Sequence, residues 1–175
     1  MERDTGLLHV YWGDGKGKTT AAVGLAVRQT GQNGRVVFAQ FLKNGRSGEL
    51  SVLKQLEGVA LCCDCTASKF VAKMTPEERA EYARRCREQL RQAFDLAQTR
   101  DMLVLDEALD ACELGMLEQA ELLALLDGRP AGLEVVVTGH SLPQEIARRA
   151  GYITQMQSQR HPYDRGIKAR RGVEY

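Results

Sequence analysis

The sequence predicts an α/β protein in which a mainly parallel sheet lies between two layers of helices. Short apolar runs alternate with helical segments along most of the chain, an order typical of βαβ units. Two of the runs, 102–105 and 135–137, are apolar at every position, as expected for strands covered on both faces. We therefore expect a three-layer α/β/α sandwich. Because no repeat, linker or low-complexity segment interrupts the pattern, we assign residues 1–175 to a single domain.

The first hundred residues alternate regularly between the two kinds of element. Their β-favouring runs and helical runs predict strand 7–12, helix 18–30, strand 35–41, helix 48–56, strand 59–65 and, after a loop at 66–74, helix 75–98. The last helix has the clearest start. Thr75 is spaced as its N-cap, Pro76 takes the first helical position, and Glu78 completes a capping box.

The remaining residues continue the alternation. They predict strand 102–106, helix 117–127, strand 133–139, helix 142–150 and a sixth strand at 152–157. Ser141 and Gln144 have the spacing of a capping box before the last helix. In parallel α/β sheets, ligands bind at the carboxyl ends of the strands, so functional residues are expected there.

The composition narrows the function classes. The chain has 175 residues, 43% of them hydrophobic and 27% charged, which is ordinary for a globular protein. A net charge of +1 argues against a nucleic-acid or membrane surface, and no apolar run reaches the ~18 residues of a membrane span. The N-terminus lacks a signal-peptide layout, and we expect a cytoplasmic protein.

Three of the five cysteines, Cys62, Cys63 and Cys65, form a C-C-x-C cluster. Disulfides are not expected, because the number of cysteines is odd and the N-terminus shows no export signal. In a strand, Cys63 and Cys65 would face one side and Cys62 the other, so the three thiols would not converge on one metal ion. We interpret them as small buried residues of the strand.

The stretch GDGKGKTT, residues 13–20, lies between the first strand and the first helix and resembles a phosphate-binding loop. The usual pattern is G-x-x-x-x-G-K-[ST], but Trp12 stands where the first glycine should be. Only three residues separate Gly13 from Gly17. The alternatives are a chance glycine-rich turn, an ordinary ATPase loop with a defect, or a loop shaped for another task.

The position of the loop favours phosphate binding, because its backbone N–H groups and the positive end of the following helix would face one ligand. An ammonium about 4 Å from a phosphate contributes roughly 4 kcal/mol at an effective dielectric near 20. The candidate nucleotide-binding residues are Gly13, Asp14, Gly15, Lys16, Gly17, Lys18, Thr19 and Thr20.

Asp106 and Glu107 follow the apolar run 102–105, where P-loop proteins place acids that bind Mg²⁺ directly or through water. With the Thr19 hydroxyl they are the candidate magnesium ligands; a charged turn is the simpler alternative. Both motifs are expected at one sheet edge, which indicates a P-loop NTPase fold of the RecA-like kind.

Three segments, 13–31, 105–108 (LDEA) and 161–175 (HPYDRGIKARRGVEY), resemble the P-loop type of ATP:corrinoid adenosyltransferase, the cob(I)yrinic acid a,c-diamide adenosyltransferase family. The resemblance implies transfer of the 5′-deoxyadenosyl group of ATP to the cobalt of a reduced corrinoid, with release of triphosphate. It also implies a cobalamin or cobyrinic acid a,c-diamide type of corrinoid, Mg²⁺, a flavoprotein reductant and a homodimer. In this family the nucleotide lies in the loop in the opposite sense to that in most P-loop proteins. We infer that a loop one residue shorter suits this placement of the phosphates.

The implied chemistry assigns roles to several residues. Co(I) attacks C5′ itself, so no protein nucleophile is needed, and none of His9, His140 and His161 forms an evident triad. Lys16 and Lys18 with Mg²⁺ would stabilise the leaving triphosphate, which makes Lys18 and Glu107 the catalytic candidates. Arg28 matches a phosphate contact of the family, with an exposed helix arginine as the alternative.

The family's corrinoid region corresponds to the loop 66–74. Phe70 matches one aromatic position that displaces the lower axial ligand of cobalt, whereas Ala72 stands at the second. The alternative is that Phe70 belongs to the core. His140 replaces a common arginine, Gly151 replaces a common aspartate, and the N-terminus is short relative to longer relatives.

The basic tail 160–175 is either a solvated terminus or, as the family ending favours, an ordered segment beside the active site. Two rival functions remain open. One is a RecA-like ATPase in which Glu107 positions water, and the other is a binding module for corrinoid or ATP without turnover.

Overall fold

The computed structural model describes residues 5–173 and contains one six-stranded sheet with the order β3-β2-β4-β5-β1-β6. Every strand pair in this part of the chain is parallel. The strands are β1 (Leu8–Trp12), β2 (Val36–Gln40), β3 (Val59–Cys62), β4 (Met102–Asp106), β5 (Glu134–Gly139) and β6 (Tyr152–Gln155). The predicted parallel sheet is therefore confirmed.

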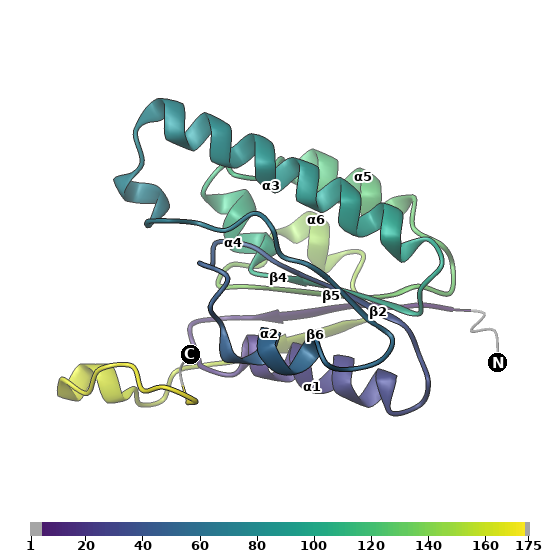
Figure 1. Cartoon of the computed structure of the whole chain (residues 1–175), viewed down its shortest axis with the longest axis horizontal. Helices are drawn as coiled ribbons and strands as arrows, with labels where there is room; N and C mark the ends of the chain where they lie inside the picture. The colour runs from purple at the N-terminus through teal and green to yellow at the C-terminus, as the bar shows by residue number, and fades with distance from the viewer. Residues whose placement is uncertain (1–4, 174–175) are drawn as a thin grey trace.

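Helices cover both faces of the sheet, with α1 and α2 on one side and α3, α4, α5 and α6 on the other (Figure 1). Their bounds are α1 (Lys18–Thr30), α2 (Gly48–Leu53), α3 (Pro76–Ala97), α4 (Ala108–Glu113), α5 (Gln119–Asp127) and α6 (Gln144–Ala147). Short 3₁₀ helices occupy Val71–Lys73 and Pro162–Arg165. This arrangement is the predicted three-layer sandwich.

Strand periodicity sends alternate side chains of the central strands into two cores. Leu103 and Val135 pack in the core on the side of α3 to α6, whereas Val104 and Val136 pack on the side of α1 and α2. All of β4 is buried, as its uninterrupted apolar run predicts. The rigid centre of the sheet thus fixes the positions of the loops at its carboxyl edge.

Local signals account for the clearest element boundary. The Thr75 hydroxyl accepts a hydrogen bond from the Glu78 amide, and the Glu78 carboxylate accepts one from the Thr75 amide at 2.7 Å. The predicted capping box with proline at the first turn is confirmed. No helix within residues 5–173 has both the length and the apolar character required to cross a membrane.

Some expected elements differ from the structure. Ser141 does not cap α6, because the helix begins only at Gln144 and Pro143 takes the N-cap position. The Ser141 hydroxyl donates to the Glu113 carboxylate at 2.9 Å. The helix there is only Gln144–Ala147. Helix α4 was not predicted. It is six residues long and begins directly after the β4 motif without a side-chain cap, so no periodic pattern or cap marks it.

The cysteine cluster also differs from the expectation, because β3 ends at Cys62 instead of continuing to residue 65. Cys62 and Cys65 pack in the same core, and Cys63 packs on the opposite side of the sheet. The expectation that Cys63 and Cys65 share a face is therefore wrong. Within residues 5–173, no group of His, Cys, Asp or Glu is arranged to hold a metal ion by itself.

Candidate active site

The loop of residues 13–20 joins the end of β1 to the first turn of α1. It packs against Met156, in the segment that follows β6. Gly13 and Gly17 have φ of 112° and 114°, a region that favours glycine. A Cβ on Gly13 would lie 2.3 Å from the Met156 carbonyl oxygen, and one on Gly15 would lie 2.7 Å from the Met156 carbonyl carbon. The Gly15 amide donates to Met156 O at 2.8 Å. This close approach of Met156 explains why positions 13 and 15 require glycine.

Lys18 bridges the loop from the first turn of α1. Its Nζ donates to the Gly13 carbonyl at 2.6 Å and to the Gly15 carbonyl at 2.9 Å. Helix α1 has Gly17 at its N-cap position and no side-chain cap, so its first-turn N–H groups are left for another acceptor. The loop therefore brings an ammonium group and uncapped amides to one place, which suits an anion.

Asp106 is fully buried at the end of β4 and accepts three side-chain hydrogen bonds. Thr19 and Thr138 donate to Oδ1 at 2.9 and 2.8 Å, and Gln40 donates to Oδ2 at 3.0 Å. Burial raises the pKa of Asp106, and the three donors oppose that shift. The structure thus brings Thr19 and Asp106 together, as the sequence predicts for a magnesium site.

Glu107 stands at the N-cap position of α4 with φ of 59°, an uncommon conformation for a residue other than glycine. Its Oε1 lies 2.6 Å from Lys43 Nζ. Burial raises the pKa of Glu107, and the nearby Lys43 opposes this. For Lys43, burial alone would lower the pKa, but the carboxylates of Glu107, Asp106 and Glu49 together outweigh it and the pKa is raised.

A polar cavity of about 920 Å³ opens in front of the loop. All predicted loop residues except Gly13 line it, together with Arg46, Ser47 and Glu49 at the start of α2. From the tail, His161, Gly172 and Val173 line it as well, which agrees with a tail beside the site. Glu174 and Tyr175, the end of the family-like segment, lie outside the described residues.

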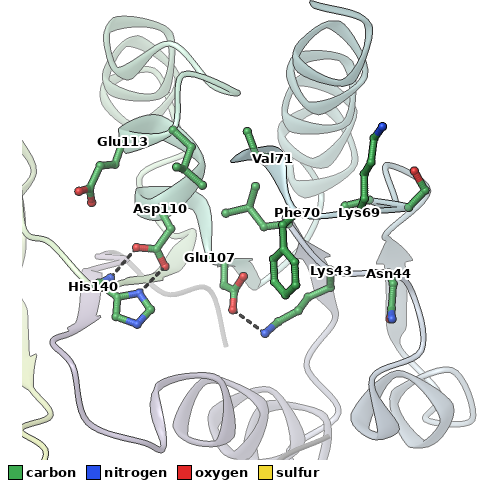
Figure 2. Close-up of a pocket in the computed structure, with 13 residues that line it drawn as sticks. Lys43, Asn44, Lys69, Phe70, Val71, Glu107, Asp110, Glu113 and His140 are labelled. Carbon is green, nitrogen blue, oxygen red and sulfur yellow. Dashed lines mark hydrogen bonds and ion pairs between the residues drawn. The ribbon is translucent and has the colours of Figure 1, made fainter. Parts of the chain in front are cut away.

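A second cavity, of about 670 Å³, adjoins the first and is lined by the loop that carries Phe70 (Figure 2). Its apolar walls come from Leu42, Ala67, Phe70, Val71 and Leu114. Phe70 is 79% exposed, so the alternative that Phe70 belongs to the core is wrong. Ala72 is exposed too, but it does not line this cavity.

The two cavities meet at four residues that line both, namely Lys43, Asn44, Glu107 and His140. His140 is oriented by Asp110, which lies 3.0 Å from Nδ1 and accepts a hydrogen bond from the His140 amide at 2.8 Å (Figure 2). Lys43, Asn44 and Asp110 were not predicted. Lys43 and Asn44 come after the carboxyl end of β2, and this position at the sheet edge is the signal that could have identified them.

Two predicted positions lie away from both cavities. Arg28 is in the last turn of α1, about 15 Å along the helix from Lys18, and lines neither cavity. Within one chain the structure therefore does not bring Arg28 to the loop of residues 13–20. Gly151 packs against the Leu7 side chain, so its difference from the family pattern does not alter the cavity walls.

Comparison with known proteins gives consistent matches. The family model of the ATP:corrinoid adenosyltransferase BtuR/CobO/CobP matches residues 4–175. A corrinoid adenosyltransferase of Pseudomonas aeruginosa is 33% identical over 98% of this chain and 85% of the relative. The Escherichia coli K12 enzyme is 30% identical over 98% and 87%. Corrinoid adenosyltransferase CobA of Salmonella typhimurium is 29% identical over 99% and 88%.

Proposed function

This chain belongs to the ATP:corrinoid adenosyltransferase family, and from that premise we propose how its residues perform the reaction. The enzyme transfers the 5′-deoxyadenosyl group of ATP to the cobalt of a reduced corrinoid. No comparison favours the alternatives of a RecA-like ATPase or a non-catalytic binding module.

The observation that carries the proposal is the junction of the two cavities. The polar one holds the triphosphate against the loop 13–20, and the apolar one beside Phe70 takes the corrin face. The C5′ atom of ATP then lies at the junction, near Lys43, Glu107 and His140. Holding the two reactants at this distance and orientation can supply ~7–11 kcal/mol of the barrier in favourable cases.

The loop contributes by holding the leaving group. Lys18 exchanges its two carbonyl partners, Gly13 and Gly15, for phosphate oxygens when ATP binds, and Lys16 adds a second charge. The uncapped amides at the start of α1 complete the cradle. Charge that develops on the departing triphosphate is stabilised by these preorganised groups without a proton transfer.

The residues present fit a magnesium ion. The Thr19 hydroxyl and an Asp106 carboxylate oxygen are 2.9 Å apart, and Glu107 is the adjacent acid at the same edge. Mg²⁺ in proteins takes oxygen ligands, with one or two carboxylates and several waters, and this set has that composition. When bound, the ion neutralises charge on the triphosphate. We propose that Thr19 and Asp106 hold it and that Glu107 orients a water ligand.

The chain supplies no nucleophile for the reaction. The Co–C5′ bond forms as the C5′–O5′ bond breaks, and triphosphate carries away the electron pair. Protein side chains bind, orient and exclude water. The homodimer, the flavoprotein reductant, the cytoplasmic location and the single domain stay predictions, and the choice between cobalamin and a cobyrinic acid a,c-diamide type substrate stays open.

An anaerobic assay tests the proposed function. The protein is incubated with ATP, Mg²⁺ and chemically reduced cobalamin, and visible spectroscopy follows formation of the Co–C bond. Triphosphate is expected in amounts equal to the alkylated corrinoid. Release of phosphate without corrinoid would support the ATPase, and binding of both substrates without alkylation would support the binding module.

A further inference from the structure

Two buried cysteines from different parts of the chain lie in contact within one core cluster. The sulfur atoms of Cys65 and Cys86 are 3.2 Å apart, and the residues are 3% and 0% exposed. Cys65 follows β3, and Cys86 lies within α3. A disulfide bond is about 2.05 Å long, so the two sulfurs need to approach by only about 1 Å to form one.

No other pair of cysteines in residues 5–173 has its sulfur atoms in contact. The thiols of Cys62 and Cys63 face the backbone carbonyls of Gln89 and Phe38, each at 3.5 Å. Burial raises the pKa of Cys62 to about 12 and that of Cys63 to about 11. The Cys86 thiol instead lowers the pKa of Cys65 through their hydrogen bond, which favours the thiolate that attacks an oxidant.

The pair sits at the base of the loop 66–74, which we call the Phe70 loop. Cys65 is anchored by its amide, which donates to Gln89 Oε1 at 2.7 Å on α3. Two residues later, Ala67 lines the apolar cavity, and its amide donates to the Lys43 carbonyl at 2.8 Å. Thr66, Ser68, Lys69 and Phe70, which follow Cys65, are exposed, so an oxidant would reach the buried thiols when this segment opens by local unfolding.

We propose that Cys65 and Cys86 are a reversible dithiol–disulfide site, oxidised by peroxides or small disulfides, and that the bond fixes the Phe70 loop to α3. With a peroxide, the Cys65 thiolate attacks one oxygen and the O–O bond breaks to give a sulfenic acid. Cys86 then attacks that sulfur and expels water. In total the two thiols lose two electrons and two protons, and the peroxide becomes two molecules of water. A thiol reductant reverses the change.

A fixed Phe70 loop can no longer adjust to the corrin face, so oxidation slows adenosyl transfer while ATP binding at the loop 13–20 continues. This consequence rests on the proposed function, whereas the bond itself does not. The expected cellular effect is that transfer declines under oxidising conditions, in which Co(I) is also scarce.

The bond is tested on the full chain under native conditions. Fully reduced protein is treated with hydrogen peroxide or diamide, and its intact mass should fall by about 2 Da. Trypsin should then release peptide 55–69 joined to the dipeptide 86–87, with fragmentation placing the bond on Cys65. Cys65→Ala and Cys86→Ala should abolish the link, whereas Cys63→Ala and Cys112→Ala should keep it.

Two further measurements complete the test. Hydrogen exchange of the amides in 66–74 should slow by about ten-fold in the oxidised protein. Melting temperatures establish whether each variant folds. If Cys86→Ala does not fold, the peptide mapping of the oxidised wild type is sufficient to show whether the Cys65–Cys86 bond forms. Oxidation of Cys63 and Cys112 while Cys65 and Cys86 stay free would overturn the proposal. An active enzyme whose transfer is unchanged by a proven Cys65–Cys86 bond would overturn its effect on the loop.

Discussion

Lys43 Nζ lies 2.6 Å from Glu107 Oε1 at the junction of the two cavities. The pair joins a residue that follows β2 to one that follows β4, and neither side chain is fully buried. It holds the Glu107 carboxylate at the place where the proposed adenosyl transfer occurs. Because both groups face both cavities, a change in either one is expected to affect transfer more than folding.

Glu107→Gln should lower the rate of transfer by about ten- to a hundred-fold, because the variant weakens the water-mediated placement of Mg²⁺. Neither the wild type nor this variant should release phosphate in the absence of corrinoid. Glu57→Gln, an exposed position that lines neither cavity, serves as the control and should stay near the wild-type rate. Strong phosphate release by the wild type that disappears in Glu107→Gln would instead favour the ATPase.

The raised pKa of Glu107 predicts that the stability of the protein depends on pH. Because burial raises the pKa of Glu107, the folded protein holds this proton at pH values where the unfolded chain has lost it. The contribution of Glu107 to the free energy of unfolding therefore falls as the pH rises from the ordinary glutamate pKa, 4.5, through the raised one. Metal-free protein is measured in urea between about pH 5 and pH 7.5.

The comparison with Glu107→Gln separates this contribution from that of surface carboxylates such as Asp127, whose pKa is lowered by Arg149. The difference in unfolding free energy, wild type minus variant, should decrease toward higher pH. A difference that is constant or increases across the range would show that the Lys43 attraction outweighs burial.

Lys18→Ala should reduce ATP affinity by at least about a hundred-fold, equivalent to about 2.7 kcal/mol. The ammonium group donates hydrogen bonds to two loop carbonyls, so its removal leaves the core unchanged. Calorimetry measures the affinity and circular dichroism the fold. Lys54→Ala, at the end of α2 and outside both cavities, should bind ATP as the wild type does. An affinity within a factor of two of the wild type would remove the loop from the nucleotide site.

Gly15→Ala should destabilise the protein by about 1–3 kcal/mol, the usual cost of overpacking. Its Cβ would meet the backbone of Met156, which cannot rotate away. Gly24→Ala is the control, since no atom lies within 4 Å of its Cβ and alanine in a helix adds roughly 0.5–1 kcal/mol of stability. Equal melting temperatures for the two variants would mean that the segment after β6 does not pack on the loop.

The layer architecture, the sheet and the place of the loop 13–20 between β1 and α1 could be predicted because their signals are local. The capping box at Thr75 and the apolar run of β4 each depend on neighbouring residues only. Asp106 was found for the same reason. Its hydrogen-bond partners Gln40 and Thr138 could not be predicted, because they lie on β2 and β5 and contact Asp106 only when the sheet forms.

Other features depend on long-range contacts that no local pattern records. The need for glycine at position 15 comes from Met156, far along the chain. Likewise, α6 begins only at Gln144, and the Ser141 hydroxyl donates to Glu113 on α4, so the expected cap does not form. Tertiary contacts therefore decided the details that sequence patterns left out or misplaced.

The exposure of Phe70 defines its test. At 79% exposed, its truncation to alanine should change the free energy of unfolding by no more than about 0.5 kcal/mol. Phe94→Ala, in the core, should cost about 3–5 kcal/mol and serves as the contrast. ATP affinity should also be unchanged in Phe70→Ala, because Phe70 does not line the polar cavity.

Phe70→Ala should slow transfer sharply when a mild flavoprotein donor must reduce Co(II), because the proposed task of the ring is to displace the lower axial ligand. The loss should be much smaller when a strong chemical reductant supplies Co(I), since that task is then already complete. Phe70→Leu, which keeps apolar bulk, should recover part of the rate with the mild donor. The two rates are measured by the visible spectrum of the alkylated corrinoid. Equal losses with both reductants, at an unchanged melting temperature, would assign Phe70 to substrate binding instead of ligand displacement.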